Sequence, residues 1–537
     1  MERMLIYYCR LLSMSLCVVL AFAVSACGGE PEPTDTPLQQ EYELRVTPER
    51  IDAPAEGVAE GVVVEISTTA PSWRITASEG GSWVYVDKTS GLRGESWVRV
   101  GVAKNSGAER EMTLRVTATG CDDRCVVVHQ DEYMDEPPTD DSEFYGGEVY
   151  IEECSDGMDS MSVGELTHDM GLAWNLGNTL ECPGNEYAWG NIHTTRELID
   201  AVAAMGFKSV RLPVAWGQYY DGKYGDYHIS DEWLDRVQEI VDWCLANDMY
   251  VIINEHWDNG KLNELRATQR EELNREFEVM WRRIAIRFRD YDYRLIFAGC
   301  NEVHDPELTT DGGDGYTDEA FESHNMLLRT FVQTVRSTGG RNAYRYLAVQ
   351  SFNTMIDLLH RLELPEDNVE GRMLVECHYY TPYPFCLMER YESWLGDKDY
   401  MYLWDSYLPS NLRGNSYYTR EQMERDIRKF GEWCCERGVG GIVGEFAAMS
   451  RVAMSREAGR YDEWCASRAW WHYSVVELCR RNGLCPMLWD NGDAKSADVD
   501  GGGWINRSRR EFVYKSVLDA MQDAMRGEPF EYVGDGE

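Results

Sequence analysis

The segment LIFAGCNEVHD, from Leu295 to Asp305, begins as an apolar run and ends abruptly in an amide, Asn301, and a carboxylate, Glu302. A strand that is buried on both faces shows this continuous apolar pattern, and buried polar groups need hydrogen-bonding partners. We therefore expect a buried strand whose polar end meets partners from elsewhere in the chain.

Seven further short apolar runs have the same character, and segments with helical periodicity lie between them. In Ser230–Asp248, for example, apolar residues recur on one helical face, and Thr194 with Glu197 predicts a capping box at the start of another helix. The region between the fifth and sixth runs is shorter and less clearly helical. Eight strands with helices between them predict a (β/α)8 TIM barrel. The runs are 172–177, 209–213, 249–256, 294–299, 344–351, 373–380, 440–446 and 485–490.

The region 42–131 differs from the rest of the chain. Short β-branched runs such as GVVVEIST (61–68) and MTLRVTAT (112–119) alternate apolar and polar residues between turn signals, which predicts a small all-β immunoglobulin-like sandwich. With GSWVYVDKTSG (81–91) and the terminal VVVHQD (126–131), the region resembles the BACON domain, a module common beside carbohydrate-active enzymes. It contains Trp73, Trp83 and Trp97, which either bind glycan or belong to the core.

The remaining segments predict export and a lipid anchor. Arg3 and Arg10 precede an apolar stretch, and VSAC ends at Cys27, so residues 1–26 resemble a lipoprotein signal peptide with Cys27 as the lipidated residue. Residues 27–41 read as a tether, 132–144 as an acidic linker, and 145–532 as the barrel domain. We expect an exported chain, anchored to the outer membrane or cell surface by lipid alone.

Composition narrows the partners. A formal net charge of −41 argues against nucleic acid and polyanionic substrates, because phosphates and other anions demand basic surfaces. A neutral binding partner and a monomeric chain are expected.

The cysteine content limits the disulfides. Without the signal peptide and Cys27, thirteen of the sixteen cysteines remain, so full pairing is impossible. Cys121 and Cys125 could bridge the end of a hairpin. No Cys-x-x-Cys pair indicates a zinc site.

Functional side chains of a TIM barrel lie at the carboxyl ends of its strands. Every predicted strand here ends in hydrogen-bonding or aromatic residues, and two of them, Glu302 after the fourth and Glu445 after the seventh, face each other across the barrel mouth. Two such carboxylates are the machinery of glycoside hydrolysis, retaining configuration at a separation of about 5–5.5 Å and inverting it at a wider one.

The barrel region resembles glycoside hydrolase family 5, a family of retaining barrel glycosidases. The matching motifs are WNLGNTL (174–180), GFKSVRLPVAW (206–216), FAGCNEV (297–303), ECHYYTPYPF (376–385), IVGEF (442–446) and MLWDNG (487–492). With WGN (189–191), the first motif is most similar to the subgroup of endo-β-1,4-glucanases and xyloglucanases.

The resemblance implies a role for each matching residue. Glu302 would be the general acid/base, Asn301 would bind the sugar 2-hydroxyl, and Glu445 would be the nucleophile. Arg211 and Tyr380 would hold that nucleophile ionised and oriented. Trp489 would be an aromatic platform under the sugar at the cleavage point. These further substrate-binding positions are Arg211, Tyr380, His256, His378, Trp489 and Asn178.

Three positions depart from the family pattern. Trp257 follows His256 where the family often has a second histidine, and Val303 follows Glu302 where it usually has proline. Glu255 is an unexpected carboxylate, and strand alternation predicts that it points away from His256, outside the barrel. These departures bear on the choice of polysaccharide.

We expect an endo-acting enzyme that cleaves internal β-1,4 bonds of xyloglucan, mixed-linkage β-glucan or cellulose without a metal or organic cofactor. A β-mannanase on the same scaffold is the nearest alternative, because the chemistry is identical and only the subsites differ. A non-catalytic glycan-binding surface lipoprotein is the alternative from another class, and turnover of a glycan by the protein would exclude it.

Overall fold

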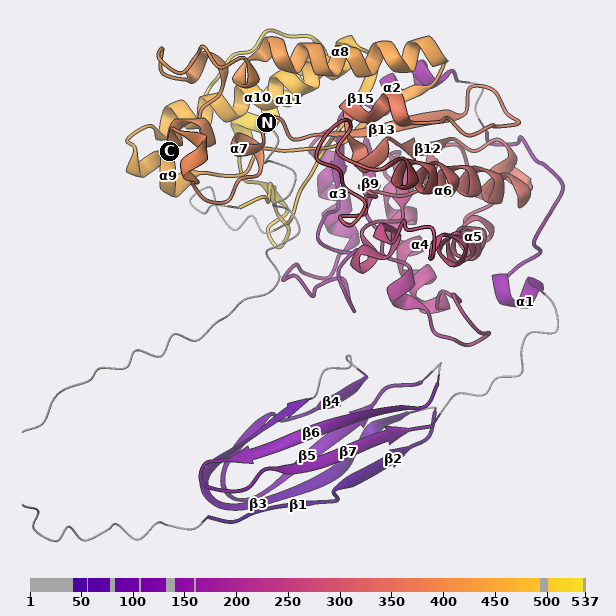
Figure 1. The fold of residues 1–537 in the computed structure, drawn as a ribbon, viewed down its shortest axis with the longest axis vertical. Helices are drawn as coiled ribbons and strands as arrows, with labels where there is room; N and C mark the ends of the chain where they lie inside the picture. The colour runs from indigo at the N-terminus through magenta and orange to yellow at the C-terminus, as the bar shows by residue number, and fades with distance from the viewer. Residues whose placement is uncertain are drawn as a thin grey trace, which may run out of the picture. The chain divides into compact units, whose positions relative to one another are not determined.

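The computed structural model describes residues 42–534, apart from 56, 78–82, 106–107, 132–140, 159–160 and 493–500. The expected signal peptide, tether and Cys27 lie outside the described residues. Two compact units are present, one holding strands β1 to β7 and the other holding the barrel (Figure 1). No helix among the described residues is long and apolar enough to cross a membrane. Helix α1 (Asp141–Tyr145) ends in the barrel domain but starts within the stretch expected to be linker.

The N-terminal unit is all β, as predicted. Its seven strands run in the order β2-β7-β6-β3-β5-β4, with β1 paired to β3. Strand β3 is long, and its buried positions change from even to odd numbers between Thr68 and Trp73, where its pairing with β5 shifts register. A bulge of this kind exchanges the two faces of a strand. The strands are β1 (Leu44–Thr47), β2 (Arg50–Ala53), β3 (Val58–Ala77), β4 (Val84–Val86), β5 (Ser90–Val102), β6 (Arg110–Ala118) and β7 (Arg124–Gln130).

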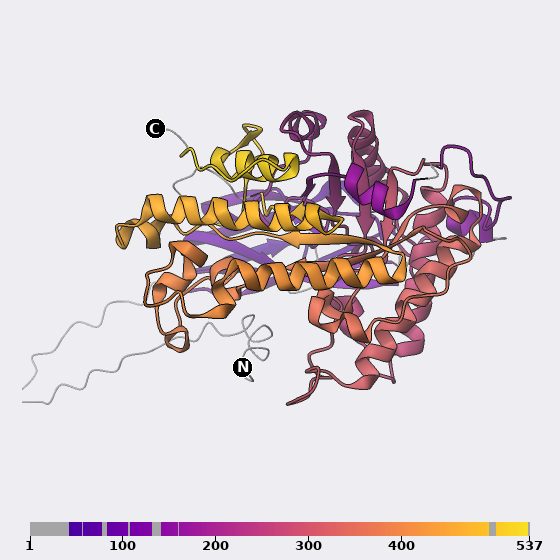
Figure 2. The same cartoon turned by 90° about the horizontal axis from the view of Figure 1, so that it is seen from above.

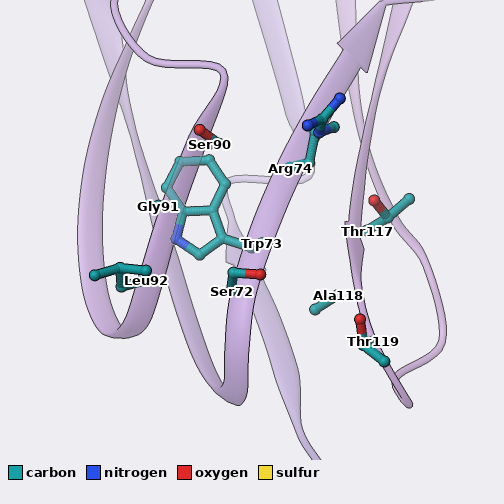
Figure 3. Close-up of a pocket in the computed structure, with 9 residues that line it drawn as sticks. All are labelled: Ser72, Trp73, Arg74, Ser90, Gly91, Leu92, Thr117, Ala118 and Thr119. Atoms are coloured by element: carbon teal, nitrogen blue, oxygen red, sulfur yellow. The ribbon is translucent and has the colours of Figure 1, made fainter.

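The tryptophans of this unit have different environments. Trp73 and Trp83 are buried in its core, whereas Trp97 is 56% exposed on β5. The Trp73 ring lies against Gly91, where any Cβ would collide with it, and Nε1 of Trp73 donates to the hydroxyl of Ser96 at 3.3 Å. Figure 3 shows this ring beside the strand that carries Ser90 and Gly91, at the edge of a hollow of about 780 Å³. The first two tryptophans are therefore core residues.

Two cysteines sit at the turn of the β6–β7 hairpin. Cys121 and Cys125 are both free thiols, so the bridge considered for this hairpin is not formed. Cys125 is exposed and Cys121 is partly buried.

The second unit is a closed barrel of eight parallel strands, which confirms the predicted fold class. The strands follow the order β10-β11-β12-β13-β14-β15-β8-β9, and every neighbouring pair is parallel. Each strand falls within or overlaps the apolar run expected to form it. They are β8 (Ala173–Asn175), β9 (Ser209–Leu212), β10 (Tyr250–Asn254), β11 (Leu295–Ala298), β12 (Leu347–Gln350), β13 (Met373–Tyr379), β14 (Gly440–Phe446) and β15 (Leu484–Leu488).

Helices separate consecutive strands except between β12 and β13, where two 3-10 segments, η5 (Phe352–Thr354) and η6 (Ile356–Arg361), replace an α-helix. The long helices α8 and α10 run side by side, as Figures 1 and 2 show. The helices are α3 (Arg196–Ala204), α4 (Asp231–Ala246), α5 (Arg270–Arg287), α6 (Asp318–Ser337), α7 (Tyr383–Cys386), α8 (Arg420–Arg437), α9 (Val452–Glu457), α10 (Tyr461–Arg481) and α11 (Lys515–Arg526). A small ribbon of β16 (Ile505–Asn506) and β17 (Glu511–Phe512) precedes α11.

The predicted capping box of α3 is wrong. The residue that precedes the helix is Thr195, and its side chain makes no capping hydrogen bond. Thr194 is buried instead: its amide donates to Glu186 at 3.3 Å and its carbonyl accepts from Arg236 at 2.7 Å. Glu186 and Arg236 form an ion pair at 3.0 Å, and both contact the main chain of Thr194.

The barrel interior has two kinds of layer. Near the amino ends of the strands it is apolar, with inward residues such as Ile252, Ile296 and Leu374 in one cluster. Helix α2 (Val163–Asp169) contributes Leu166 to this cluster, and Met170, the residue after the helix, joins it as well. Towards the carboxyl ends the inward positions become charged, and this layer forms the candidate site.

Candidate active site

Arg211 lies at the centre of the site. It is an inward residue of β9, and its guanidinium is fully buried. Nη1 donates to Oε1 of Glu445 and to Oδ1 of Asn175, both at 3.0 Å, and Nη2 donates to Oδ1 of Asn301 at 2.7 Å. Nη2 also lies 2.9 Å from Oε1 of Glu376. The planar fork of arginine allows one side chain to orient four partners from different strands.

Glu445 ends β14 and has two fixed donors. Besides Arg211, the hydroxyl of Tyr380 donates to its Oε2 at 3.0 Å. The side chain is only 7% exposed. Strand alternation alone would turn Glu445 outward, since Ile442 faces the interior and Val443 faces the helices. A register shift against both neighbouring strands includes Gly444 and brings Glu445 opposite His378.

Glu302 follows β11 and faces His378. Nδ1 of His378 lies 2.7 Å from Oε1 of Glu302 and 3.6 Å from Oε2 of Glu445. One ligand atom from each of these three residues lies within 4.8 Å of the others. Glu302 is 43% exposed, far more than Glu445. The two carboxylates are therefore close together, and only Glu302 has ready access to solvent.

The imidazole of His378 carries a proton at neutral pH. Burial alone would lower its pKa, but the carboxylates of Glu445, Glu302 and Glu376 outweigh burial and raise the pKa of His378 to about 9. Burial alone would likewise raise the pKa of Glu376, but Arg211 and His378 lower it to about 2. Glu376 is therefore a permanent anion inside the barrel.

The paired carboxyls titrate together. Burial raises the pKa of Glu445 above its ordinary value against the charges of His378 and Arg211, and the negative charge of Glu302 raises it further. The partial burial of Glu302 would raise its pKa, but its hydrogen bond with His378 holds that pKa below the ordinary value. A proton bound at this site therefore belongs to Glu302 and Glu445 together rather than to one of them.

His256 and Trp489 form a second part of the site. Their rings are stacked, with centroids 5.5 Å apart and planes 9° apart. Burial, Arg211 and His378 hold the pKa of His256 well below its ordinary range, so the ring stays neutral. The indole of Trp489 donates to Oδ1 of Asn491 at 2.6 Å, which fixes its orientation.

Asn178 is linked to this aromatic pair through its main chain. Its carbonyl accepts from Asn191 at 2.7 Å, and Asn191 also donates to the carbonyl of Asn491 at 2.8 Å. Asn178 has a positive φ of 52°. The Asn178 amide donates to Glu181, so the main chain of Asn178 links the Glu181 segment to the Trp489 loop. The other predicted residues meet at Arg211, His378 or the Trp489 ring.

The three departures from the family pattern have structural explanations. Val303 is buried, and its amide donates to the carbonyl of Asn301 at 3.0 Å, which a proline could not do. Glu255 points away from the barrel interior as predicted: burial, Asp258 and Glu276 of α5 raise its pKa well above the ordinary value. Trp257 is 41% exposed, and its ring centroid lies 5.7 Å from that of Trp189.

Two groups of this site were not predicted from the sequence. Glu376 accepts from Gln350, contacts His378 and forms an ion pair with Arg211. Asn175 donates to the carbonyl of Gly444 at 2.9 Å. The signal for Glu376 was present, because 376, 378 and 380 alternate along one strand and so share a face. A carboxylate inside an apolar run indicates a buried charge that needs partners on its own face of the strand.

A parallel barrel with paired carboxylates at the carboxyl ends of its strands defines a barrel glycoside hydrolase. The family model "Cellulase (glycosyl hydrolase family 5)" matches residues 175–495, and the chain belongs to that family.

The similar proteins agree with this assignment. The chain is 33% identical to a xyloglucan-specific endo-β-1,4-glucanase of Bacteroides ovatus, covering 78% of this chain and 81% of the relative. It is 27% identical to Endoglucanase A of Paenibacillus barcinonensis over 69% of this chain and 92% of that one. A solved Bacteroides ovatus GH5 xyloglucanase, in complex with a XXXG heptasaccharide, superposes with a TM-score of 0.63 and 29% identity over 90% of this chain and 100% of that chain.

Proposed function

We propose that this glycoside hydrolase is a retaining endo-β-1,4-glucanase that acts on a neutral glucan, with xyloglucan as its preferred substrate. The spacing of Glu302 and Glu445 carries the proposal: an oxygen of each lies within 4.8 Å of the other. A retaining pair is about 5–5.5 Å apart, whereas an inverting pair needs about 6.5–9.5 Å for a water molecule.

In the first step the carboxylate of Glu445 attacks the anomeric carbon, and the bond to the leaving sugar oxygen breaks. The bonding electrons go to that oxygen, which takes a proton from Glu302. In the second step water attacks the anomeric carbon of the glycosyl ester and gives a proton to Glu302. The bond between that carbon and the carboxylate oxygen breaks, and its electrons restore the carboxylate of Glu445. The reaction balances without another reactant.

These steps need a proton on Glu302 and a negative charge on Glu445. Arg211, a permanent cation, and the Tyr380 hydroxyl both contact Glu445, and no hydrogen bond joins either to Glu302 among the described residues. His378 contacts Glu302 at 2.7 Å and can return a proton to it directly. The contacts with Arg211 and Tyr380, which keep their protons, thus support Glu445 as the nucleophile. The contact with His378, which can exchange a proton, supports Glu302 as the acid.

Neutral sugar recognition is supported by the remaining residues. Trp489 and neutral His256 offer a flat apolar surface, and Asn301 is oriented by Arg211 for a sugar hydroxyl. The exposed pair Trp189 and Trp257 adds aromatic surface of the kind that sugar rings contact. Xyloglucan is favoured because the named relative with 33% identity is specific for it.

The test is reducing-end release from xyloglucan, mixed-linkage β-glucan, cellulose and β-mannan by the wild type, Glu302→Gln and Glu445→Gln. We expect turnover of xyloglucan, a rapid fall in viscosity, and the β-anomer as the first product by proton NMR. An α-anomer as first product would refute the retaining mechanism. Preferential turnover of mannan would refute the glucanase assignment, and binding of glycan without turnover would refute catalytic activity.

We also propose that Cys27 is lipidated and anchors the exported chain at the outer membrane or cell surface. The support is the VSAC sequence before the tether. Labelled palmitate should appear in the wild type and not in Cys27→Ser, which should be released from membranes. Equal labelling of both proteins would refute the anchor.

A further inference from the structure

Glu376 occupies an unusual position for a carboxylate. It lies in the middle of β13 and is fully buried. Its Oε1 accepts from Nε2 of His378 at 3.2 Å and lies 2.9 Å from Nη2 of Arg211, and its Oε2 accepts from Nε2 of Gln350 at 2.7 Å. Glu376 therefore links His378, which contacts Glu302, to Arg211, which contacts Glu445.

The surrounding backbone makes room for this carboxylate. Gly444, next to Glu445, has no side chain, and a Cβ there would collide with the carboxylate of Glu376. The register shift that turns Glu445 inward falls at the same residue. The space for Glu376 and the orientation of Glu445 thus depend on one glycine.

Gln350 completes the setting. Its Oε1 accepts from the amide of Cys300 at 3.0 Å, which fixes the orientation of the side-chain amide and directs Nε2 to Glu376. Both oxygens of Glu376 therefore have hydrogen-bonding partners while the carboxyl group is ionised, so Glu376 needs no proton of its own.

The charges of the site suggest what Glu376 does. Two cations, Arg211 and His378, face three carboxyls, Glu302, Glu445 and Glu376. With every carboxyl ionised the group carries one net negative charge, and binding one proton makes it neutral. Without Glu376, the cations would already balance both reacting carboxylates, and a further proton would add an uncompensated positive charge in a buried region.

We propose that Glu376 is a positioning residue that, through His378 and Arg211, retains one additional proton in the site for Glu302 to donate at neutral pH. The proposal rests on the proposed function, since it concerns the supply of the catalytic proton. Glu376 itself touches neither Glu302 nor Glu445 through a hydrogen bond among the described residues.

The groups that face His378 support this role. Glu302 follows β11, Glu445 ends β14, Arg211 is on β9 and Glu376 is on β13 itself. Two further titratable groups of the site, His256 after β10 and Tyr380 after β13, stay neutral, because burial holds the pKa of His256 well below and that of Tyr380 well above its ordinary value. The charge of His304 acts on Glu302 and lowers the pKa of that carboxyl.

The test compares wild type, Glu376→Gln, Glu376→Asp and the exchange variant Glu376→Gln/Gln350→Glu, which returns a carboxylate to the neighbouring side chain. His378 is titrated by NMR with isotope-labelled histidine and assigned with a His378→Asn variant. In parallel, kcat/KM on xyloglucan is measured across pH. Circular dichroism confirms that each variant is folded.

We expect Glu376→Gln to lower the pKa of His378 by about 1–2 units, because one of its three anions is lost. The alkaline limb of kcat/KM should move to lower pH by a similar amount. Glu376→Asp and the exchange variant should restore at least half of both shifts. If Glu376→Gln does not fold, a folded exchange variant with a raised His378 pKa supports the proposal.

An unchanged His378 titration in folded Glu376→Gln would overturn the proposal, even if thermal stability fell, because a purely structural role moves only stability. A low His378 pKa in the folded exchange variant would overturn it as well. A wild type that turns over no glucan would refute the proposed function instead, and the His378 titration would then decide the Glu376 proposal by itself.

Discussion

Leu374 and Glu376 are two residues apart on β13, and both point into the barrel. Leu374 belongs to the apolar cluster near the amino ends of the strands, whose members are aliphatic, aromatic and sulfur-containing residues. Glu376 belongs to the layer above, where each charged group is paired with an opposite one. Leu374 and Glu376 are both fully buried. The lower layer is stabilised by removal of apolar surface from water, and the upper one is tolerated because its charges compensate each other.

The comparison shows how the barrel separates stability from chemistry. A change in the lower layer alters packing and leaves the reacting groups alone. A change in the upper layer leaves a buried charge unpaired or removes a reacting group. Substitutions in the lower layer should therefore affect unfolding alone, whereas those in the upper layer should affect turnover and, where a buried charge is left unpaired, unfolding as well.

The largest effect is expected for Glu445→Gln, which removes the nucleophile from the charged layer. We expect kcat to fall by about 10⁴-fold or more, with little change in the unfolding midpoint, because the amide keeps the volume of the side chain. Initial rates on xyloglucan measure this. Glu436→Gln, a change at an exposed side chain, is the matched control and should have wild-type activity.

The next largest effect is expected for Arg211→Lys. A lysine ammonium cannot contact Glu445, Asn301, Asn175 and Glu376 together, so kcat/KM should fall by about 10²–10³-fold. The surface variant Arg437→Lys serves as control. Wild-type kinetics in Arg211→Lys would mean that the fork geometry is unimportant and that any cation suffices.

Leu374→Ala tests the lower layer. It should destabilise the protein by about 2–5 kcal/mol, through lost burial and the cavity left behind. The value of kcat below the unfolding transition should stay within about twofold of wild type. Urea unfolding and initial rates provide the two measurements. A loss of kcat as large as that of an upper-layer variant would remove the distinction between the layers.

The pH dependence of stability probes the charged layer as a whole. The folded pKa of His378, about 9, exceeds the unfolded value of about 6.5. The folded state therefore binds more protons between these values, so the stabilisation is complete below pH 6.5 and is lost as the pH rises through 9. The difference in unfolding free energy between wild type and His378→Gln should shrink by up to about 3 kcal/mol over this range. A constant difference would contradict the assignment.

The smallest effect is expected outside both layers, at exposed Trp257. Replacement by alanine removes aromatic surface without touching the charged groups, so KM for xyloglucan should rise about threefold to tenfold while kcat is retained. Trp97→Ala, a change at another exposed tryptophan, in the N-terminal unit, should leave both constants unaltered. A fall in kcat for Trp257→Ala would indicate that this ring also positions the reacting groups.

Much of this arrangement was accessible from the sequence. Eight apolar runs ended in polar groups, and each became a barrel strand because a parallel strand buried on both faces requires a continuous apolar pattern. The runs also placed Glu302, Arg211, His378 and Trp489 at one end of the barrel. The short region between β12 and β13 has no strong helical pattern in the sequence, and in the structure it forms 3-10 segments in place of an α-helix.

Other features depended on contacts between distant segments. Thr194 matched a capping motif, yet its ion-paired neighbours Glu186 and Arg236 bury it and leave α3 without a side-chain cap. Trp73 could have been a glycan platform, and only the β3–β5 pairing puts its ring against Gly91. Local sequence cannot distinguish these outcomes, because the deciding partners are far along the chain.

By itself, the sequence determined the barrel and the polar residues at its strand ends, Glu302 and Glu445 among them, because the apolar runs and the residues that end them are local properties. Only the tertiary structure decided how Glu445 reaches the interior. Alternation turns it outward, and the bulge at Gly444, which exists only when β13, β14 and β15 pair, turns it back. The same closure buries Glu376 between Arg211 and His378, since a buried carboxylate is stable only where opposite charges from other strands surround it.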